Sequence, residues 1–435
     1  MATRPALRIA SVQFAFEGNP AVIPLRDPRT LDFLGASPEW TLAGSRHPAA
    51  FIGGSRPRVR VTFQRAAGAA SDSRPWRISA RGTHGHGLTA RTVHLTFDAN
   101  GKSQPVDFRF AKAVPRGIGE VRRHWRWHAE HAGHNHAFGV TRHHIYHTWR
   151  RAIEPAAWAV TSERQQGPFG KPDAPWVYLP LMHWTCRWAA GRNTDKSVCD
   201  AIIANVRRSG LRYAVTAYNV GQMLQEGGGY CGGWFRMFQA MAGAHGVRVH
   251  RRAFLTDWRM EHRDIMRWCA IVVSAPGLGR RRPAEAASLF HDSNMGRARH
   301  YPIQRFRVRR YRFWGAPGSK ADGHCINFLQ YRGRWYLYDA CFFDRPVALR
   351  DFKLPRASAQ RTVAVERLGT FQKAYLNRAV SHMLGSLRHG DKLYKTVHAE
   401  PRQPQFTGRM TRNGLSVKTA IIPGRWRNIT FYWME

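Results

Sequence analysis

Residues 227–247 read GGGYCGGWFRMFQAMAGAHGV, and this stretch carries the strongest structural signal in the chain. Glycines crowd around one cysteine, Cys231. Apolar residues then recur at spacings of three and four positions, and they are Trp234, Phe235, Phe238, Met241 and Ala242. This spacing predicts an amphipathic helix that begins at Cys231.

A cysteine at the start of a helix is placed for nucleophilic chemistry. The unpaired N–H groups and the positive end of the helix dipole favour the thiolate form, which lowers the pKa of the thiol. The flanking glycines let a substrate backbone approach closely. The alternative interpretation is an ordinary buried cysteine in a core helix, so a nucleophile needs a base elsewhere in the chain.

Residues 322–339 offer that base and read DGHCINFLQYRGRWYLYD. Two alternating, aromatic-rich runs flank Arg332-Gly333, which predicts a β-hairpin. With a two-residue loop, Asp339 lies opposite Ile326, on the face that Ile326 shares with His324. His324 and Asp339 are then diagonal neighbours on one face. A loop of odd length would reverse this relation.

These residues suggest a Cys-His-Asp triad. Cys231 would attack a carbonyl carbon, His324 would accept the thiol proton, and Asp339 would fix the tautomer and orientation of the imidazole. The backbone N–H of Cys231 or of Gly232 would help to hold the oxyanion.

The Gly-x-Cys helix start, the Gly-Val that follows the helix and the His and Asp of one aromatic hairpin resemble the transglutaminase-like core of papain-related thiol enzymes. The resemblance covers about residues 190–345, including a helix predicted from Lys196 and the Leu-Arg-Tyr at 211–213. It implies an α+β fold in which a helix bearing Cys231 packs on an antiparallel sheet bearing His324 and Asp339.

Two features of the family are less well matched. Its aromatic or amide residue that assists the oxyanion has Tyr213 as a candidate here, with a packed helix-end tyrosine as the alternative. The interval between Cys231 and His324 is long for the bare core, which predicts an insertion. That insertion includes the basic residues 277–283 and 305–312.

The part of the chain before this core follows a period of two from about residue 45 to residue 128, which predicts antiparallel strands. The alternating runs are Val59–Phe63, Trp76–Ala80, Val93–Phe97, Val106–Phe110 and Val121–Trp127. Asp98-Ala99-Asn100-Gly101 supplies the Asn-Gly of a tight turn. Residues 1–128 are therefore predicted to form a β-sandwich, of which the immunoglobulin-like arrangement is one form.

Eight of the 22 histidines lie in residues 124–147. The breaks at Gly133 and Asn135 predict a loop, and the Trp- and Pro-rich residues 149–190 predict irregular structure, so residues 129–189 are interpreted as a connector. A metal site in this cluster is a weaker alternative because only Glu130 lies inside it and no cysteine is near. No metal or other cofactor is expected for the triad.

The catalytic core is predicted to span residues 190–350 and a C-terminal α/β extension to span residues 351–435. The extension has a helical pattern around Phe371–Ala379. Strand patterns follow at Leu415–Ile421 and Ile429–Trp433.

The composition excludes several classes of protein. Apolar residues make up 43% of the 435 positions, which is too much buriable surface for a disordered chain. No apolar run is long enough to span a membrane, and no Sec-type signal sequence is visible. A cytoplasmic location, or export by another route, is the expectation. The six cysteines form no C-x-x-C pair, so neither a zinc ribbon nor a disulfide scaffold is predicted.

The balance of 68 Lys and Arg against 28 Asp and Glu gives a formal net charge of +40. The favoured function is hydrolysis of an amide bond in a protein or peptide substrate, with a bias toward acidic substrates. One alternative is a transglutaminase-type crosslinker, although no calcium loop is visible. A second is a nucleic-acid-binding protein that uses the basic, aromatic residues 306–314. Solvated arginines without a partner would also explain the charge.

Overall fold

The computed structural model describes residues 7–66, 74–153, 167–171, 174–213, 217, 219–229, 231–258, 266–274, 311–314, 322–341, 343–352, 361–364, 380–389, 392–399, 406–407 and 429–434. The chain divides into two compact units. The first contains Met1–Val198 with Ala240–Val247, and the second contains Cys199–Gln239 with Arg248–Glu435.

The first unit contains two larger β-sheets. The order of the four-stranded sheet is β3 (Trp40–Thr41), β1 (Leu7–Gln13), β5 (Arg58–Arg65) and β8 (Val106–Arg109). The order of the five-stranded sheet is β4 (Ala49–Ile52), β10 (His134–Thr148), β9 (Gly119–His131), β6 (Trp76–Gly82) and β7 (Leu88–Val93). Among these strands only the β4–β10 pair is parallel.

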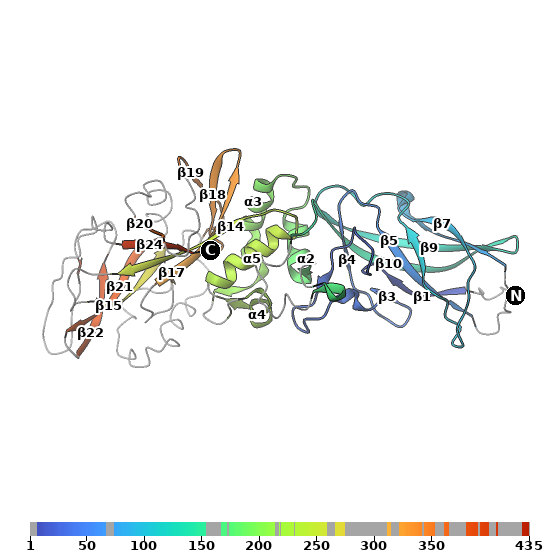
Figure 1. Cartoon of the computed structure of the whole chain (residues 1–435), viewed down its shortest axis with the longest axis horizontal. Helices are drawn as coiled ribbons and strands as arrows, with labels where there is room; N and C mark the ends of the chain where they lie inside the picture. Colours follow the sequence, from blue (N-terminus) through green and yellow to red (C-terminus); the bar gives the residue numbers. More distant parts are fainter. Residues whose placement is uncertain are drawn as a thin grey trace. The chain divides into compact units, whose positions relative to one another are not determined.

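The two sheets pack face to face around an aromatic core. Alternate residues of β5 and β9 point inward, and Phe63, Trp125 and Trp127 are completely buried. The ring of Phe63 on one sheet lies 6.0 Å from that of Trp127 on the other, in an edge-to-face arrangement. This unit is therefore a β-sandwich, and Figure 1 shows its strands in blue to teal.

The loop predicted for the histidine cluster is wrong. Residues 119–148 form the long β9–β10 hairpin, which turns at Ala132 and Gly133 with φ angles of 51° and 81°. A two-residue turn with both φ angles positive matches the twist of a hairpin, so Gly133 continues the hairpin instead of ending the structure. The predicted boundary between residues 128 and 129 falls inside β9.

Two strand predictions differ in detail. The strand predicted at Val93–Phe97 begins earlier, as β7, and ends at Val93. The turn predicted at residues 98–101 is present: the Gly101 N–H donates to the Asp98 carbonyl at 2.9 Å, and Gly101 has a φ of 72°. It closes the isolated bridge between Phe97 and Ser103 instead of joining two of the named strands.

Part of the region predicted to be irregular is helical. Helix α2 (Leu179–Trp188) has Pro180 in its first turn, where the missing N–H costs nothing because that position has no helical partner. The shorter elements of this unit are β2 (Leu25–Arg26), β11 (Val177–Tyr178), η1 (Leu34–Ala36), η2 (Thr83–Gly85) and η4 (Pro168–Gly170).

The second unit combines helices with two larger sheets. The helical elements at and after the unit boundary are α3 (Asp195–Asn205), η5 (Val206–Ser209), α4 (Val220–Glu226) and α5 (Cys231–Gly243). The six-stranded sheet has the order β19 (Val347–Leu349), β18 (Arg334–Tyr338), β17 (Asp322–Tyr331), β14 (His250–Trp258), β24 (Ile429–Met434) and β20 (Arg361–Ala364). The five-stranded sheet has the order β16 (Tyr311–Trp314), β15 (Met266–Ser274), β21 (Val380–His389), β22 (Lys392–Ala399) and β23 (Phe406–Thr407).

The C-terminal residues join the sheets of this unit instead of standing apart as an extension. Strand β24 pairs with β14, and β20 pairs with β24, in the sheet that contains β17 and β18. Strand β15, from the predicted insertion, pairs with β21 in the other sheet. The patterns predicted at Phe371–Ala379 and Leu415–Ile421, and the basic residues 277–283, lie outside the described residues.

The fold class is α+β, as predicted. In the described part of the chain, no helix is long and apolar enough to cross a membrane.

Candidate functional site

Helix α5 begins at Cys231, where the sequence predicts it. The glycines around Cys231 are needed for packing as well as for the approach of a substrate. A Cβ atom added to Gly229 or Gly233 would lie 2.8 or 2.9 Å from the carbonyl oxygen of Ala217, which is closer than any real Cβ contact. Glycines on both sides of Cys231 therefore let a neighbouring backbone segment lie directly against the helix start.

Tyr213 belongs to a second segment beside this helix start. The two-residue strand β12 (Arg212–Tyr213) pairs in parallel with β13 (Gly228–Gly229), and Tyr213 lies opposite Gly229. Because Gly229 is two positions before Cys231, the backbone of the oxyanion candidate Tyr213 runs next to the start of α5. Gly232, the other oxyanion candidate, is a buried residue of the first helical turn.

The hairpin that carries His324 and Asp339 has the predicted register. Tyr331 pairs with Arg334, and the turn residues Arg332 and Gly333 have φ angles of 50° and 75°. The ladder continues to the pair of Asn327 and Tyr338. Asp339 is the next residue after β18, so its register position is opposite Ile326, two positions after His324.

The carboxyl group of Asp339 is buried, with only 1% of the residue exposed. Its Oδ1 accepts a hydrogen bond from the N–H of Cys341 at 3.0 Å, and its carbonyl oxygen accepts one from the N–H of Phe343 at 2.9 Å. These two bonds fix the chain just beyond β18. A carboxylate held in this way could orient an imidazole without moving itself.

Helix α5 packs on this hairpin through two contacts. The side-chain amide of Asn327 donates to the carbonyl oxygen of Phe235 at 3.2 Å. The ring of Phe238 stacks on that of Tyr338, with 5.2 Å between centroids and 24° between planes. Since Asn327 and Tyr338 are directly opposed in the ladder, one cross-strand pair holds the helix that begins at Cys231.

A third contact sets the direction of α5 along β17. The side-chain amide of Gln239 donates to the carbonyl oxygen of Val249, which directly precedes the pair of His250 with Phe328. Helix residues 235 to 239 therefore lie alongside strand residues 327 to about 329. Four helical residues span about 6 Å and two strand residues span about 7 Å, so the helix and strand segments between these contacts have nearly the same length. Extended by four more residues at the same spacing, this alignment puts the backbone of Cys231 level with about position 325, next to His324.

Strand alternation limits how the triad could close. Asn327 and Tyr338 lie on the face that α5 covers, whereas Ile326 and the register position of His324 belong to the alternate set. A contact between Cys231 and His324 therefore requires an approach around the end of α5, not beneath its side. The first turn of α5, rather than its middle, is the part of the helix that matters for this chemistry.

Two positioning residues were not predicted from the sequence. Asn327 is one, and its amide is the signal that could have revealed it, because it is a polar residue on the core side of an apolar strand. Asp200 of α3 is the other, and its Oδ1 accepts a hydrogen bond from the Tyr338 hydroxyl at 2.8 Å. Burial raises the pKa of Tyr338, so this hydroxyl remains a donor. Nothing in the spacing of the acidic residues on α3 indicated that Asp200 would bind the Tyr338 hydroxyl.

The other thiols whose surroundings are described are buried. Cys186, Cys199 and Cys341 form no disulfide bond and have at most 1% of their surface exposed. Burial raises the pKa of Cys186 well above its usual range. These three cysteines therefore behave as small apolar residues.

No three His, Cys, Asp or Glu side chains come together as a metal site requires anywhere in the described ranges. Histidines of the β9–β10 hairpin contact aromatic rings instead. The ring of His131 stacks on Trp76 at 3.8 Å, and His143 is buried against Phe14 and Trp125. The basic stretch 306–314 is described only at Tyr311–Trp314, which form strand β16.

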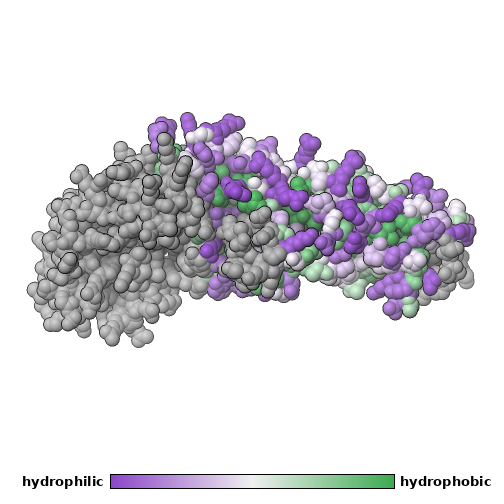
Figure 2. Space-filling model, in the orientation of Figure 1, coloured by the Kyte–Doolittle hydropathy of each residue, from purple (hydrophilic) through white to green (hydrophobic). Residues whose placement is uncertain are grey.

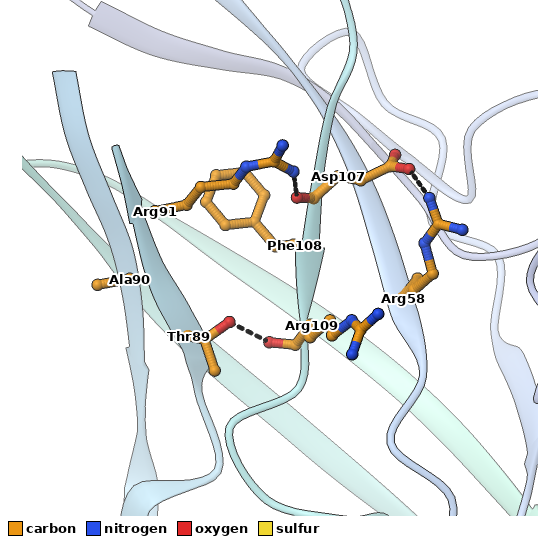
Figure 3. Close-up of a pocket in the computed structure, with 7 residues that line it drawn as sticks. All are labelled: Arg58, Thr89, Ala90, Arg91, Asp107, Phe108 and Arg109. Carbon is orange, nitrogen blue, oxygen red and sulfur yellow. Dashed lines mark hydrogen bonds and ion pairs between the residues drawn. The ribbon is translucent and has the colours of Figure 1, made fainter. Parts of the chain in front are cut away.

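A surface cavity lies in the first unit, between β7 and the β5–β8 pair (Figure 3). Arg58 forms an ion pair with Asp107, and Arg91 donates to the Asp107 carbonyl oxygen. The pKa of Asp107 is lowered because hydrogen bonds from Arg60 and Arg58 outweigh its partial burial. Three arginines line the cavity against one acid, so Asp107 neutralises only part of its positive charge.

Comparison with models of known protein families and with characterised proteins finds no match for this sequence.

Proposed function

We propose that this protein is a cysteine-dependent amide-bond enzyme with a papain-related, transglutaminase-like core, and that it most readily hydrolyses a protein or peptide substrate. The observation that carries the proposal is the packing of α5 on the β17–β18 hairpin. Extending this alignment by one helical turn toward Cys231 leads to about position 325 of β17. The hairpin register adds Asp339 on the same face as position 324.

In the proposed reaction, the Cys231 thiol gives its proton to His324 and the thiolate sulfur attacks the substrate carbonyl carbon. The oxyanion is held by the backbone N–H of Cys231 or Gly232, with Tyr213 as a further donor. The C–N bond then breaks, and the leaving amine takes the proton from His324. Water, activated by His324, attacks the thioester carbonyl, and the carboxylic acid and the free thiol are released.

Labelling with iodoacetamide near pH 6.5 tests the activated cysteine, because a lone thiol with a pKa of about 8.5 reacts slowly there. We expect Cys231 to react faster than the buried Cys186, Cys199 and Cys341, and the rate to fall at least tenfold in His324→Ala. Cys199→Ser is the matched control and should leave the labelling rate unchanged. Equal labelling of Cys231 with and without His324 would contradict the proposal.

The resolving nucleophile is tested separately. Incubation with a glutamine-rich protein and a labelled primary amine distinguishes ammonia release or peptide cleavage from transfer of the label. Hydrolysis that is lost in Cys231→Ala supports the enzyme as proposed. Transfer that is lost in the same variant indicates the transglutaminase-type crosslinker. No reaction of either kind in the intact chain would overturn both.

A further inference from the structure

The outer face of the five-stranded sheet in the first unit carries arginines for which the described residues provide no acidic partner. We call it the cationic face and define it by Arg81 on β6, by Arg122, His124 and Arg126 on β9, and by Arg142 on β10. All five are exposed, whereas the residues between them on β9, including Trp125, are buried. Figure 2 shows hydrophilic side chains over much of the described surface on its visible side.

Two arginines oppose each other directly on this face, since Arg81 pairs with Arg126 across β6 and β9. Arg142 lies opposite His124 across β10 and β9. Side chains in such pairs have Cβ atoms about 5 Å apart, and like charges there destabilise a sheet. The nearby charges of Arg81 and Arg126, after burial, lower the pKa of His128.

Acids on the same sheet occur only at the edges of the cationic face. Glu130 pairs with Arg77 at 3.8 Å, and Glu120 accepts from His144 and Arg187. Among the described residues, no carboxylate pairs with Arg81, Arg122, Arg126 or Arg142. This differs from the neighbouring sheet, where the carboxylate of Asp107 on β8 forms ion pairs with both Arg58 and Arg60 on β5.

We propose that the cationic face binds the phosphate backbone of duplex DNA without regard to base sequence. Arg122 and Arg126 are about 14 Å apart along β9, and the face is about 10 Å wide from β6 to β10. A patch of this size reaches phosphates on both sides of a minor groove about 6 Å wide. Planar guanidinium groups match phosphate oxygens in pairs, and binding releases the counterions condensed on the duplex.

The chemistry of the face favours a duplex over a single strand. Single-stranded nucleic acids are held by exposed aromatic rings on which the bases stack. On β9, Trp125 and Trp127 point into the core and are completely buried. The large apolar side chain exposed on this sheet is Val140, which offers no ring. Apart from Val140, which lies opposite Arg126, the face presents charge and hydrogen-bond donors.

The test is fluorescence anisotropy of a labelled random-sequence duplex with the full chain, at about 50 and 200 mM salt. Each phosphate contact adds about 0.9 to the slope of log affinity against log salt. Removal of two contacts in Arg81→Gln/Arg126→Gln should therefore make the loss of affinity over this salt range about tenfold smaller, and should weaken binding at low salt. The charge-conserving Arg81→Lys/Arg126→Lys should retain most of the binding.

The matched control removes two charges from the other sheet, in Arg8→Gln/Arg109→Gln, both of which are exposed. We expect it to bind duplex DNA like the parent chain. Equal weakening in both double variants would mean that net charge alone is responsible, and would overturn the proposal. So would binding to heparin or to vesicles of anionic lipid with no binding to the duplex. The thermal unfolding of each variant confirms that the sandwich is intact.

Discussion

The β9–β10 and β17–β18 hairpins turn in the same way and serve different purposes. Each has a non-glycine residue followed by glycine with positive φ angles, Ala132-Gly133 in the first and Arg332-Gly333 in the second. In the first hairpin the two faces separate an aromatic core from a charged surface. In the second, a single cross-strand pair holds a helix and the residues beside it make the candidate active site. The same backbone device can therefore support a core or position a site.

The register of the second hairpin should matter most. Insertion of one glycine into the Arg332-Gly333 turn changes the parity of the loop, so Asp339 would lose its place opposite Ile326. We expect the rate of Cys231 labelling at about pH 6.5 to fall by about 100-fold, toward that of a thiol without a base. The decrease should be smaller if His324 still reaches the thiol.

Two controls separate register from general damage. Insertion of two residues at the same turn preserves parity and should retain most of the labelling rate. Insertion of one glycine at Ala132-Gly133 should leave the rate unchanged, because that hairpin belongs to the other unit. A labelling rate that is insensitive to the first insertion would show that Asp339 and His324 do not act together.

Acid should weaken the first hairpin. Burial lowers the pKa of His143 to about 3, from an ordinary value of 6.5. Because the pKa of the folded state is lower than that of the unfolded chain, His143 stabilises the sandwich above about pH 6.5, and this contribution is lost as the pH falls. The free energy of unfolding should drop by about 1.4 kcal/mol per pH unit from this residue, or about 2 kcal/mol by pH 5.

Urea denaturation at pH 7 and pH 5 measures this loss, with His143→Leu as the comparison. The free energy of unfolding of the variant should decrease less between pH 7 and pH 5, and the difference should equal the contribution of His143. A second buried histidine, His245, has its pKa lowered to about 3 by burial in the same unit and should still contribute in the variant. An identical pH dependence in the variant and the parent would contradict the assignment.

The two turns should respond equally to loss of glycine. Gly133→Ala and Gly333→Ala each place a side chain at a φ angle that alanine disfavours, and no atom lies within 4 Å of the added Cβ at either site. Each should therefore reduce the free energy of unfolding by about 1 kcal/mol through backbone strain alone. Thermal unfolding of the two variants provides the comparison, and a much larger loss at one site would reveal a contact specific to that turn.

The smallest expected effect is a gain in stability. Arg126→Thr removes the like charge opposite Arg81 and adds a residue that favours strands. The free energy of unfolding of the sandwich should rise by about 0.5 kcal/mol, and the gain should shrink at high salt. A loss of stability would indicate that Arg126 has a stabilising partner.

Much of this fold could be predicted from local patterns. The apolar spacing after Cys231 and the alternation around Arg332-Gly333 placed α5 and the second hairpin correctly, because both elements are defined by contacts between residues close in sequence. The same logic failed for the histidine cluster. Histidine alternates there between a surface face and a core face, and the turn at Ala132-Gly133 was interpreted as the end of ordered structure.

The candidate site shows where local patterns stop. The residue types and their spacing in the sequence determined which side chains could form a triad and that Asp339 shares a face with Ile326. Only the tertiary structure decided that Asn327 anchors α5 on the β17–β18 hairpin. It also decided that the C-terminal strand β24 pairs with β14 in the sheet that contains the hairpin. Contacts such as that between Asn327 and Phe235 join residues 92 positions apart, and no periodicity within one segment encodes such a contact.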